Sequence, residues 1–205
     1  MISGSLQTVK IPERIRTVFL VWLAWMLPFF SAHAENWNLP QLMQMMAQNK
    51  AGKASFVEKK YIGALDQPIL STGNLSFMTP DKLEKHTLTP KPESLILNGD
   101  QLTLDRPGKQ SMTVSLEEYP EVATFIESIR GTLAGDRTAL EKLYALKLTG
   151  QVENWQLVLT PKQERMSSIF SSIRISGSQA KVNSIELNQR DGDHSEMIIT
   201  QIPDS

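Results

Sequence analysis

Apolar residues alternate with polar ones along most of this chain, and this two-residue spacing predicts strands. A first group of such segments ends at Leu116 and contains Asn98-Gly99, a strong hairpin signal. Its short turns favour an antiparallel meander over alternating strands and helices. The expected strands are Ala54–Tyr61, Ser71–Thr79, Lys82–Leu88, the two arms of Ser94–Asp105, Lys109–Leu116, Asn154–Thr160, Ile173–Ser176, Val182–Gln189 and His194–Gln201.

A different spacing, typical of a helix, comes before the first strand. Asn38 is a good N-cap, and Leu39, Leu42, Met43 and Met46 follow at positions i, i+3, i+4 and i+7. These residues form a single apolar stripe. The pattern therefore predicts a short amphipathic helix that is unusually rich in methionine.

Two further helices interrupt the strands. One is expected from Pro120 to Gly135, and the other begins at the capping box Thr138–Glu141 and continues through Tyr144. Because all of these helices are amphipathic, we expect a mostly β (α+β) fold in which a large sheet curls around them. This is an incomplete antiparallel β-barrel with a helical lid over an apolar cavity. The stripe of the longer helix consists of Val122, Phe125, Ile126, Ile129 and Leu133.

The apolar faces of the helices allow two interpretations. Met43 and Met46, together with Phe125, Ile126 and Ile129, would face the concave side of the sheet. Methionine is flexible and polarisable, so a surface lined by it accepts ligands of varied shape, such as acyl chains. The alternative is an ordinary packed core of methionine, leucine and isoleucine.

The N-terminal residues are typical of an export signal. Basic residues precede the apolar run Val18–Phe30, and Ser31–Ala34 supplies a cleavage site after Ala34. The run is too short to span a bilayer as a stable helix. We therefore expect residues 1–34 to be a cleaved signal peptide and residues 35–205 to form one exported domain.

Composition and motifs exclude several functional classes. The 21 Lys and Arg residues are balanced by 22 Asp and Glu, which argues against nucleic-acid binding. His86 is expected to face solvent and His194 to follow a polar turn, and the chain has no cysteine to complete a zinc site. Motifs for nucleophilic serines, phosphate loops and metalloproteases are absent. We expect neither a cofactor nor an enzyme, although folding could bring together a hydrolase site that the sequence does not show.

The order of the motifs resembles the LolA-type outer-membrane lipoprotein carriers. The matching segments are ASFVEKKY at residues 54–61, GNLSFMTPDKLEKHTLTP at 73–90, PESLILNGDQL at 92–102 and WQLVLTPK at 155–162. The resemblance spans the whole part that follows the signal. It implies an unclosed barrel with a helical lid and a periplasmic carrier of acylated cargo.

Two departures from the family pattern concern the cargo. Thr79 occupies the position of a family arginine that ties the lid to the barrel, and Leu83 replaces an aromatic residue. The chain also ends soon after its last strand, at Ser205, without the extension that such carriers usually bear. We therefore keep two cargoes open, a lipoprotein and another lipid or glycolipid, and two further classes, a hydrolase and an adaptor module.

The resemblance also implies the partners and the site. The partners are the acylated cargo, an inner-membrane transporter that loads it and an outer-membrane acceptor, with the carrier acting as a monomer. The residues expected around the acyl-chain cavity and its lid are Leu42, Met43, Met46, Phe56, Leu75, Phe77, Thr79, Leu83, Leu97, Phe125, Ile126, Ile129, Leu133, Trp155 and Leu157.

Overall fold

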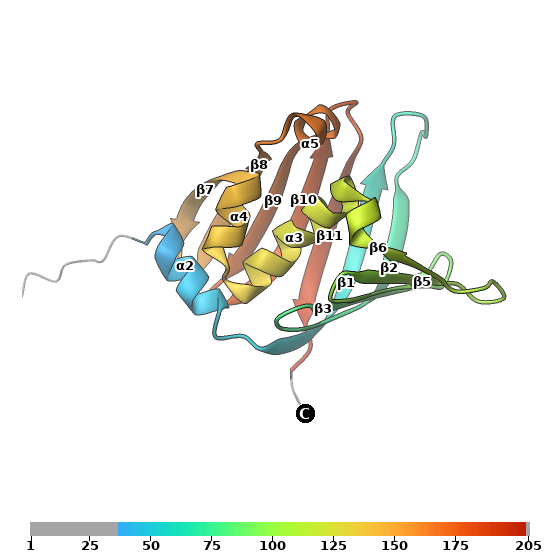
Figure 1. Ribbon diagram of the computed structural model, residues 1–205, viewed down its shortest axis with the longest axis horizontal. Coiled ribbons are helices and arrows are strands. Elements are labelled where there is room, and N and C mark those ends of the chain that lie inside the picture. The colour runs from blue at the N-terminus through green and yellow to red at the C-terminus, as the bar shows by residue number, and fades with distance from the viewer. Residues whose placement is uncertain (1–36, 204–205) are drawn as a thin grey trace, which may run out of the picture. The chain divides into compact units, whose positions relative to one another are not determined.

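Eleven antiparallel strands form one sheet in the computed structural model, which describes residues 37–203 (Figure 1). The strand order is β6-β5-β4-β3-β2-β1-β11-β10-β9-β8-β7, so two meanders meet where β1 pairs with β11. The strands are β1 (Ala51–Tyr61), β2 (Ile69–Met78), β3 (Lys82–Thr89), β4 (Glu93–Asn98), β5 (Gln101–Asp105), β6 (Met112–Ser115), β7 (Tyr144–Gln151), β8 (Asn154–Pro161), β9 (Phe170–Ser178), β10 (Lys181–Gln189) and β11 (His194–Gln201).

Helices precede and follow the N-terminal meander, and one short helix interrupts the C-terminal meander. The first, α2 (Leu39–Met46), begins with a capping box between Asn38 and Gln41. A short 3-10 helix, η2 (Leu116–Glu118), follows β6, and α5 (Glu164–Ile169) separates β8 from β9. The two longer elements of the middle segment are α3 (Pro120–Ala134) and α4 (Arg137–Leu143).

Most of the expected elements are present, and three details differ. The N-cap of α4 is Asp136, whose carboxylate accepts from the backbone N–H of Ala139 at 2.9 Å, so the predicted start at Thr138 was wrong. Tyr144 belongs to β7 and not to the helix, because Tyr144, Leu146 and Leu148 alternate toward the interior as a strand. Helix α5 was not predicted.

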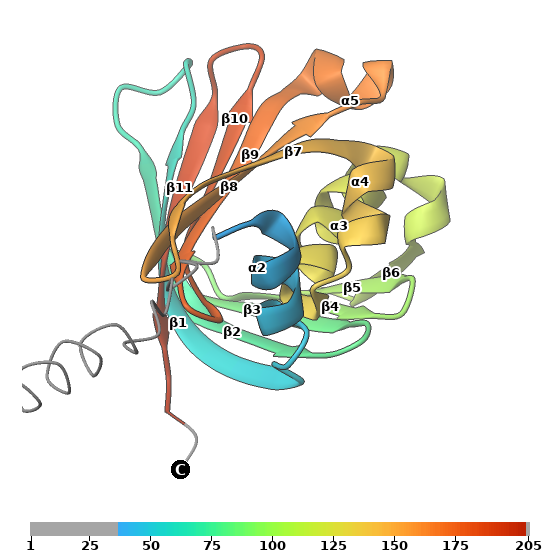
Figure 2. The same ribbon diagram turned by 90° about the vertical axis from the view of Figure 1, so that its left-hand side faces the viewer.

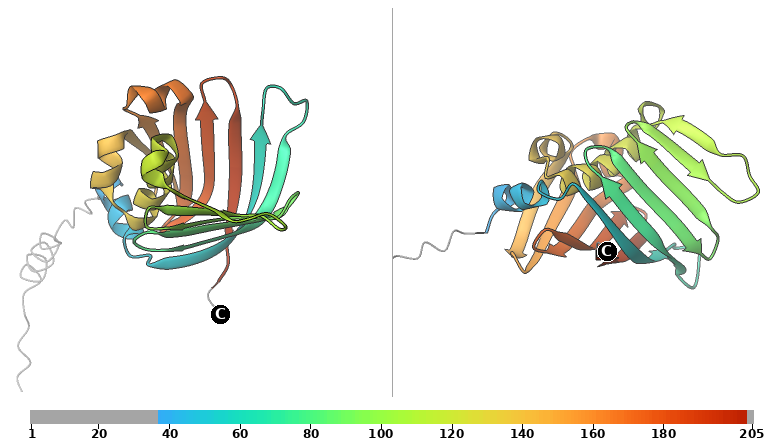
Figure 3. Two further views of the ribbon diagram at one scale, coloured as in Figure 1. Left: turned by 45° about the vertical axis from the view of Figure 1, so that its right-hand side comes forward. Right: turned by 90° about the horizontal axis from the view of Figure 1, so that it is seen from below.

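The sheet curls without closing. Strands β6 and β7 are its two edges, and α2, α3 and α4 lie within the curl (Figure 2). Strands β2–β5 fold across one side of the helices, while β7–β11 form the other side (Figure 3). The expected incomplete antiparallel barrel with internal helices is confirmed. No helix of the described residues is long and apolar enough to cross a membrane.

Most of the residues with the least exposed surface lie between the helices and strands β7–β11. Trp155 has no exposed surface, and its indole N–H donates to the carbonyl of Gln179 at 2.8 Å. Gly177 lies under the indole, where an added Cβ would stand 2.3 Å from a ring carbon. The core consists of Leu42, Met43, Met46, Ala54, Leu140, Tyr144, Trp155, Leu157, Leu159, Ile173, Ile175, Val182 and Ile199.

Tyr144 joins this core to α3. Its ring is buried, and its hydroxyl donates to the carbonyl of Thr124 at 2.8 Å. Burial raises the pKa of Tyr144 to about 12, so the hydroxyl stays a donor throughout the neutral range. The hydrogen bond fixes the first half of α3 to the start of β7.

We expect Tyr144→Phe to lower the free energy of unfolding by about 1 kcal/mol, because one buried hydrogen bond is lost. The raised pKa adds a second expectation, since the unfolded tyrosine ionises first. The wild type should lose stability as the pH rises from 10 through 12, and Tyr144→Phe should lack that part of the loss. Urea unfolding at pH 7 and at alkaline pH measures both effects. Equal alkaline profiles would contradict this role of Tyr144.

The expected signal peptide, with cleavage after Ala34, lies outside the described residues. Residues 37–203 begin just before α2 and end after β11. The signal and the single exported domain over residues 35–205 therefore stay predictions.

Candidate functional site

Helix α3 buries its small and polar face. Thr124, Ser128, Gly131 and Thr132 are buried, and the hydroxyls of the three polar residues donate to carbonyls three or four residues earlier in the helix. An added Cβ at Gly131 would lie 2.9 Å from a methyl carbon of Leu140. The small face therefore allows close packing of α3 against α4.

The apolar side chains of α3 are consequently only partly buried. We define the α3 apolar stripe as Val122, Phe125, Ile126, Ile129 and Leu133, of which Val122 is 38% exposed. Phe125, Ile129 and Leu133 pack against the core, as expected for an amphipathic helix, but keep part of their surface exposed. Phe125 stacks against Phe170, with ring centroids 6.5 Å apart, at one side of the stripe.

An apolar surface of the sheet lies on the same side as the helices. The buried Ala54 and Phe56 define the concave side of β1, and the strand register carries this side across β2 to β6. Most of its side chains keep some exposure, as those of the α3 stripe do. We define the concave apolar face as Leu75, Phe77, Leu83, Leu95, Leu97, Leu102, Leu104 and Val114.

The expected site residues separate into two groups. One group has 0–3% exposure and is packed, so it offers no surface to a ligand in this conformation: Leu42, Met43, Met46, Phe56, Leu97, Trp155 and Leu157. The flexible methionines of α2 fill the core between this helix and the C-terminal strands. The other group keeps partial exposure: Leu75, Phe77, Thr79, Leu83, Phe125, Ile126, Ile129 and Leu133.

The connection between the helices and the N-terminal meander comes from an arginine that we did not predict. Arg130 of α3 donates to the carbonyl of Gly99 at 3.3 Å and lies 3.9 Å from the carboxylate of Asp100. Glu127 holds the guanidinium at 2.7 Å. Thr79 instead bonds to the carbonyl of Lys50, at 3.2 Å from its hydroxyl, next to the end of α2. Arg130 thus ties α3 to the β4–β5 turn.

Two opposite charges also belong to the concave side. Glu58 of β1 and Lys85 of β3 form an ion pair of 2.5 Å, and their side chains are 18% and 27% exposed. The Lys85 ammonium lies 4.9 Å from the centroid of the buried Phe56 ring. The pair is not apparent in the sequence, because the two residues are distant in the chain and each stands among other charged residues.

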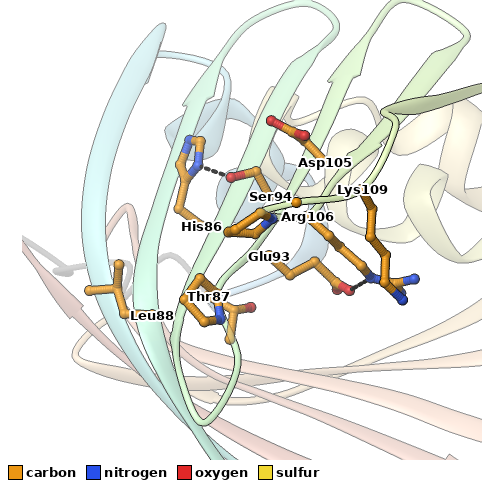
Figure 4. Close-up of a pocket in the computed structure, with 11 residues that line it drawn as sticks. His86, Thr87, Leu88, Glu93, Ser94, Asp105, Arg106 and Lys109 are labelled. Atoms are coloured by element: carbon orange, nitrogen blue, oxygen red, sulfur yellow. Dashed lines mark hydrogen bonds and ion pairs between the residues drawn. The ribbon is translucent and has the colours of Figure 1, made fainter.

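The convex side carries a chain of polar groups at the end of β3 and β4. The imidazole Nδ1 of His86 lies 2.9 Å from the hydroxyl of Ser94, and its Nε2 lies 3.2 Å from Glu84. Figure 4 shows His86 and Ser94 beside a hollow of about 510 Å³. The hollow is lined by His86, Thr87, Leu88, Pro92, Glu93, Ser94, Asp105, Arg106, Pro107, Gly108 and Lys109.

This arrangement contains a hydroxyl, an imidazole and a carboxylate in the order that nucleophilic catalysis uses. Acyl transfer also needs hydrogen-bond donors for the oxyanion. Ser94 lies in β4, which pairs with a strand on each side, so its backbone N–H belongs to the sheet. We therefore interpret this series of hydrogen-bonded polar groups as a structural feature that stabilises the pairing of β3 with β4.

Within this series of polar groups, the carboxyl group of Glu84 has a strongly lowered pKa. The Lys82 ammonium at 2.8 Å, with hydrogen bonds from His86 and Ser76, lowers the pKa of Glu84 to about 2 from its ordinary 4.5. A lowered pKa means that the ionised carboxylate stabilises the folded chain above pH 4.5. This contribution is lost as the pH falls through about 2.

Glu84→Gln is therefore expected to destabilise the protein at pH 7 and to flatten its acid dependence. The wild type should lose unfolding free energy between pH 4.5 and pH 2, and the variant should lose less over this window. Chemical unfolding at several pH values measures the difference. Parallel profiles of the two proteins would show that Glu84 does not stabilise the β3–β4 pair.

The second histidine, His194, packs against an aromatic ring. The imidazole of His194 stacks on the ring of Tyr61 with a centroid distance of 4.4 Å and an interplanar angle of 12°. Among residues 37–203, no group of three or more histidine, cysteine, aspartate or glutamate residues could hold a metal ion.

An open antiparallel sheet that curls around helices, with partly exposed apolar surfaces on both, defines an incomplete-barrel class of fold. A family model described as "Outer membrane lipoprotein carrier protein LolA-like" matches residues 31–202, and the chain belongs to this family.

Curated relatives carry the same description. The outer-membrane lipoprotein carrier protein of Pseudomonas fluorescens (strain Pf0-1) is 22% identical over 176 residues, which cover 86% of this chain and 82% of the relative. The protein of that name from Pseudomonas syringae pv. syringae (strain B728a) is 20% identical over 171 residues, with coverages of 83% and 80%.

Solved structures resemble the chain more remotely. A LolA superfamily protein of Nitrosomonas europaea aligns with a TM-score of 0.45 and 10% identity, covering 82% of this chain and 92% of that one. The Pseudomonas aeruginosa MucA/MucB complex aligns with a TM-score of 0.43 and 14% identity, covering 80% of this chain and 54% of that one.

Proposed function

We propose that this protein is a periplasmic carrier that shields acyl chains of a lipoprotein or another lipid on the way from the inner to the outer membrane. One observation carries the proposal. Helix α3 buries its small polar face and leaves the α3 apolar stripe partly exposed toward the concave side of an apolar sheet. The names of the relatives and the family support an acylated cargo.

The energetics suit reversible binding. Each methylene buried from water contributes about 0.8 kcal/mol, so a chain of about a dozen carbons gains enough to leave water. The α3 stripe and the concave apolar face would provide the covering surface.

Transport requires a supplier and a receiver. An inner-membrane transporter would load the cargo, and an outer-membrane acceptor would remove it, while the carrier itself needs neither nucleotide nor cofactor. Arg130 connects α3 to the β4–β5 turn, so release of its bond to the Gly99 carbonyl is a route by which a partner could open the site. Lipoprotein and free lipid remain the two cargoes that this geometry supports.

The proposal is tested with protein purified from cell envelopes. Native mass spectrometry should show added masses that correspond to acylated species, and tandem fragmentation should identify each as a lipopeptide or a lipid. After its ligand has been removed, the protein should bind a fluorescent fatty acid. Unlabelled dodecanamide should displace this probe by competition. A protein that carries no acylated species and binds no acyl probe would instead be an adaptor module with a closed interior.

A further inference from the structure

The ion pair of Glu58 and Lys85 lies where an acyl chain would meet the sheet. Strand register places Glu58 between Met197 and Ser71, and Lys85 between Leu75 and Leu95. All of these positions belong to the concave side. The pair is thus a charged spot next to the apolar residues of the concave side.

A glycine makes this pair possible. Gly73 of β2 lies between the two charged strands, where an added Cβ would stand 2.0 Å from the carbonyl oxygen of His86 and 2.8 Å from a carbon of Phe56. With no side chain at this position, Lys85 can extend from β3 over β2 to reach Glu58 on β1. The fold therefore brings the two charges together across an intervening strand.

Stability alone gives little reason for the pair. Partial burial removes water from both charges, and apolar residues of similar volume often stabilise a fold as well or better. The contact between them also leaves hydrogen-bonding capacity, because it uses one proton of the ammonium and one oxygen of the carboxylate. The spot therefore offers a donor and an acceptor side by side.

Resting on the proposed function, we infer that Glu58 and Lys85 bind a secondary amide that adjoins the acyl chain of the cargo. The ammonium of Lys85 donates to the amide carbonyl oxygen, and the carboxylate of Glu58 accepts from the amide N–H. Both hydrogen bonds involve a charged group, which makes them stronger than neutral ones. The cargo is then N-acylated, as in an acylated amino group of a protein or an amino sugar.

The same pair discriminates against other acyl compounds. An ester has a carbonyl oxygen but no N–H, so the carboxylate of Glu58 would lose water without gaining a partner. A free fatty acid brings a negative charge that Lys85 attracts but Glu58 repels, and it has no N–H to donate to Glu58. An unpaired or repelled buried group costs affinity, whereas the apolar chain binds equally in all three compounds.

The test compares three competitors of equal chain length on the intact exported domain. N-methyl dodecanamide, methyl dodecanoate and dodecanoate each displace a fluorescent acyl probe. We expect the wild type to bind the amide about tenfold more tightly than the ester. In Glu58→Met/Lys85→Met the amide should lose its advantage over the ester, because its N–H has no acceptor there, and the ester should bind no more weakly than to the wild type.

A matched control removes an ion pair from the opposite side of the sheet. Arg174 and Glu186 pair across β9 and β10 on the convex side, and Arg174→Met/Glu186→Met should keep the preference for the amide. Equal binding of amide and ester by the wild type would overturn the inference and leave the carrier function intact. Absence of binding by all three competitors would overturn the carrier function itself.

Discussion

Ile126→Glu is expected to weaken binding of a fluorescent acyl probe by more than about tenfold while it lowers the unfolding free energy by about 1 kcal/mol. Ile126 belongs to the partly exposed α3 apolar stripe, so water can reach the new carboxylate in the empty protein. A bound chain would remove that water without providing a partner for the charge. Probe titration and thermal unfolding measure the two effects.

Substitution of Met46 by glutamate should instead have its main effect on stability, not on probe binding. Met46 is the last residue of α2, has no exposed surface and belongs to the core. An unpaired carboxylate there costs several kcal/mol, and we expect Met46→Glu to unfold the protein. The sequence pattern predicted that Met46 and Ile126 both line the acyl-chain cavity. In the structure Met46 is fully buried, whereas Ile126 keeps some exposed surface.

Ile198→Glu provides the control for both variants. Ile198 is 57% exposed and lies on the convex side of β11, so a charge there should change neither stability nor binding. If Ile198→Glu weakened binding as much as Ile126→Glu, the bound probe would not lie along α3.

Gly135→Ala is expected to lower the free energy of unfolding by about 3 kcal/mol or more. Gly135 ends α3 with a φ of +67°, which alanine adopts only at a cost. An added Cβ would also lie 2.1 Å from the carbonyl oxygen of Met43, so α2 must move away from the α3–α4 turn. The methionines of α2 would then lose part of their packing.

The chain offers a matched glycine for this experiment. Gly108 has a φ of +74° and no neighbour within 4 Å of an added Cβ. Gly108→Ala therefore reports the backbone strain alone, which is about 1 kcal/mol. Chemical unfolding of both variants isolates the contribution of the contact with α2. Equal losses would mean that this contact does not hold α2 in place.

The alternation of residues predicted most of the sheet, because one side of each strand faces apolar surroundings. The strand β7 was missed because Tyr144 follows a helix directly and its apolar residues also fit a continued helical stripe. The capping box at Thr138 was misleading since Asp136 lies two residues earlier and caps the same helix.

The candidate site was harder to predict, for a physical reason that α3 illustrates. Thr124, Ser128 and Thr132 are polar in the sequence, yet each hydroxyl bonds to its own helix and can be buried. A hydropathy pattern therefore identifies the apolar stripe, most of which packs against the core, but misses the second, polar face of α3, which is buried as well. The pair of Glu58 and Lys85 depends on the empty position at Gly73, which only the strand register reveals.

The junction of the two meanders has a consequence for how the chain folds. Strand β1 is the first of the sheet and its neighbour β11 is the last, so Phe56 aligns with Ile199. Closing so large a loop is slow compared with forming neighbouring hairpins. Each meander can assemble locally, but the middle of the sheet forms only once the final strand is available. The two halves of the sheet therefore stay separate until β11 has been added.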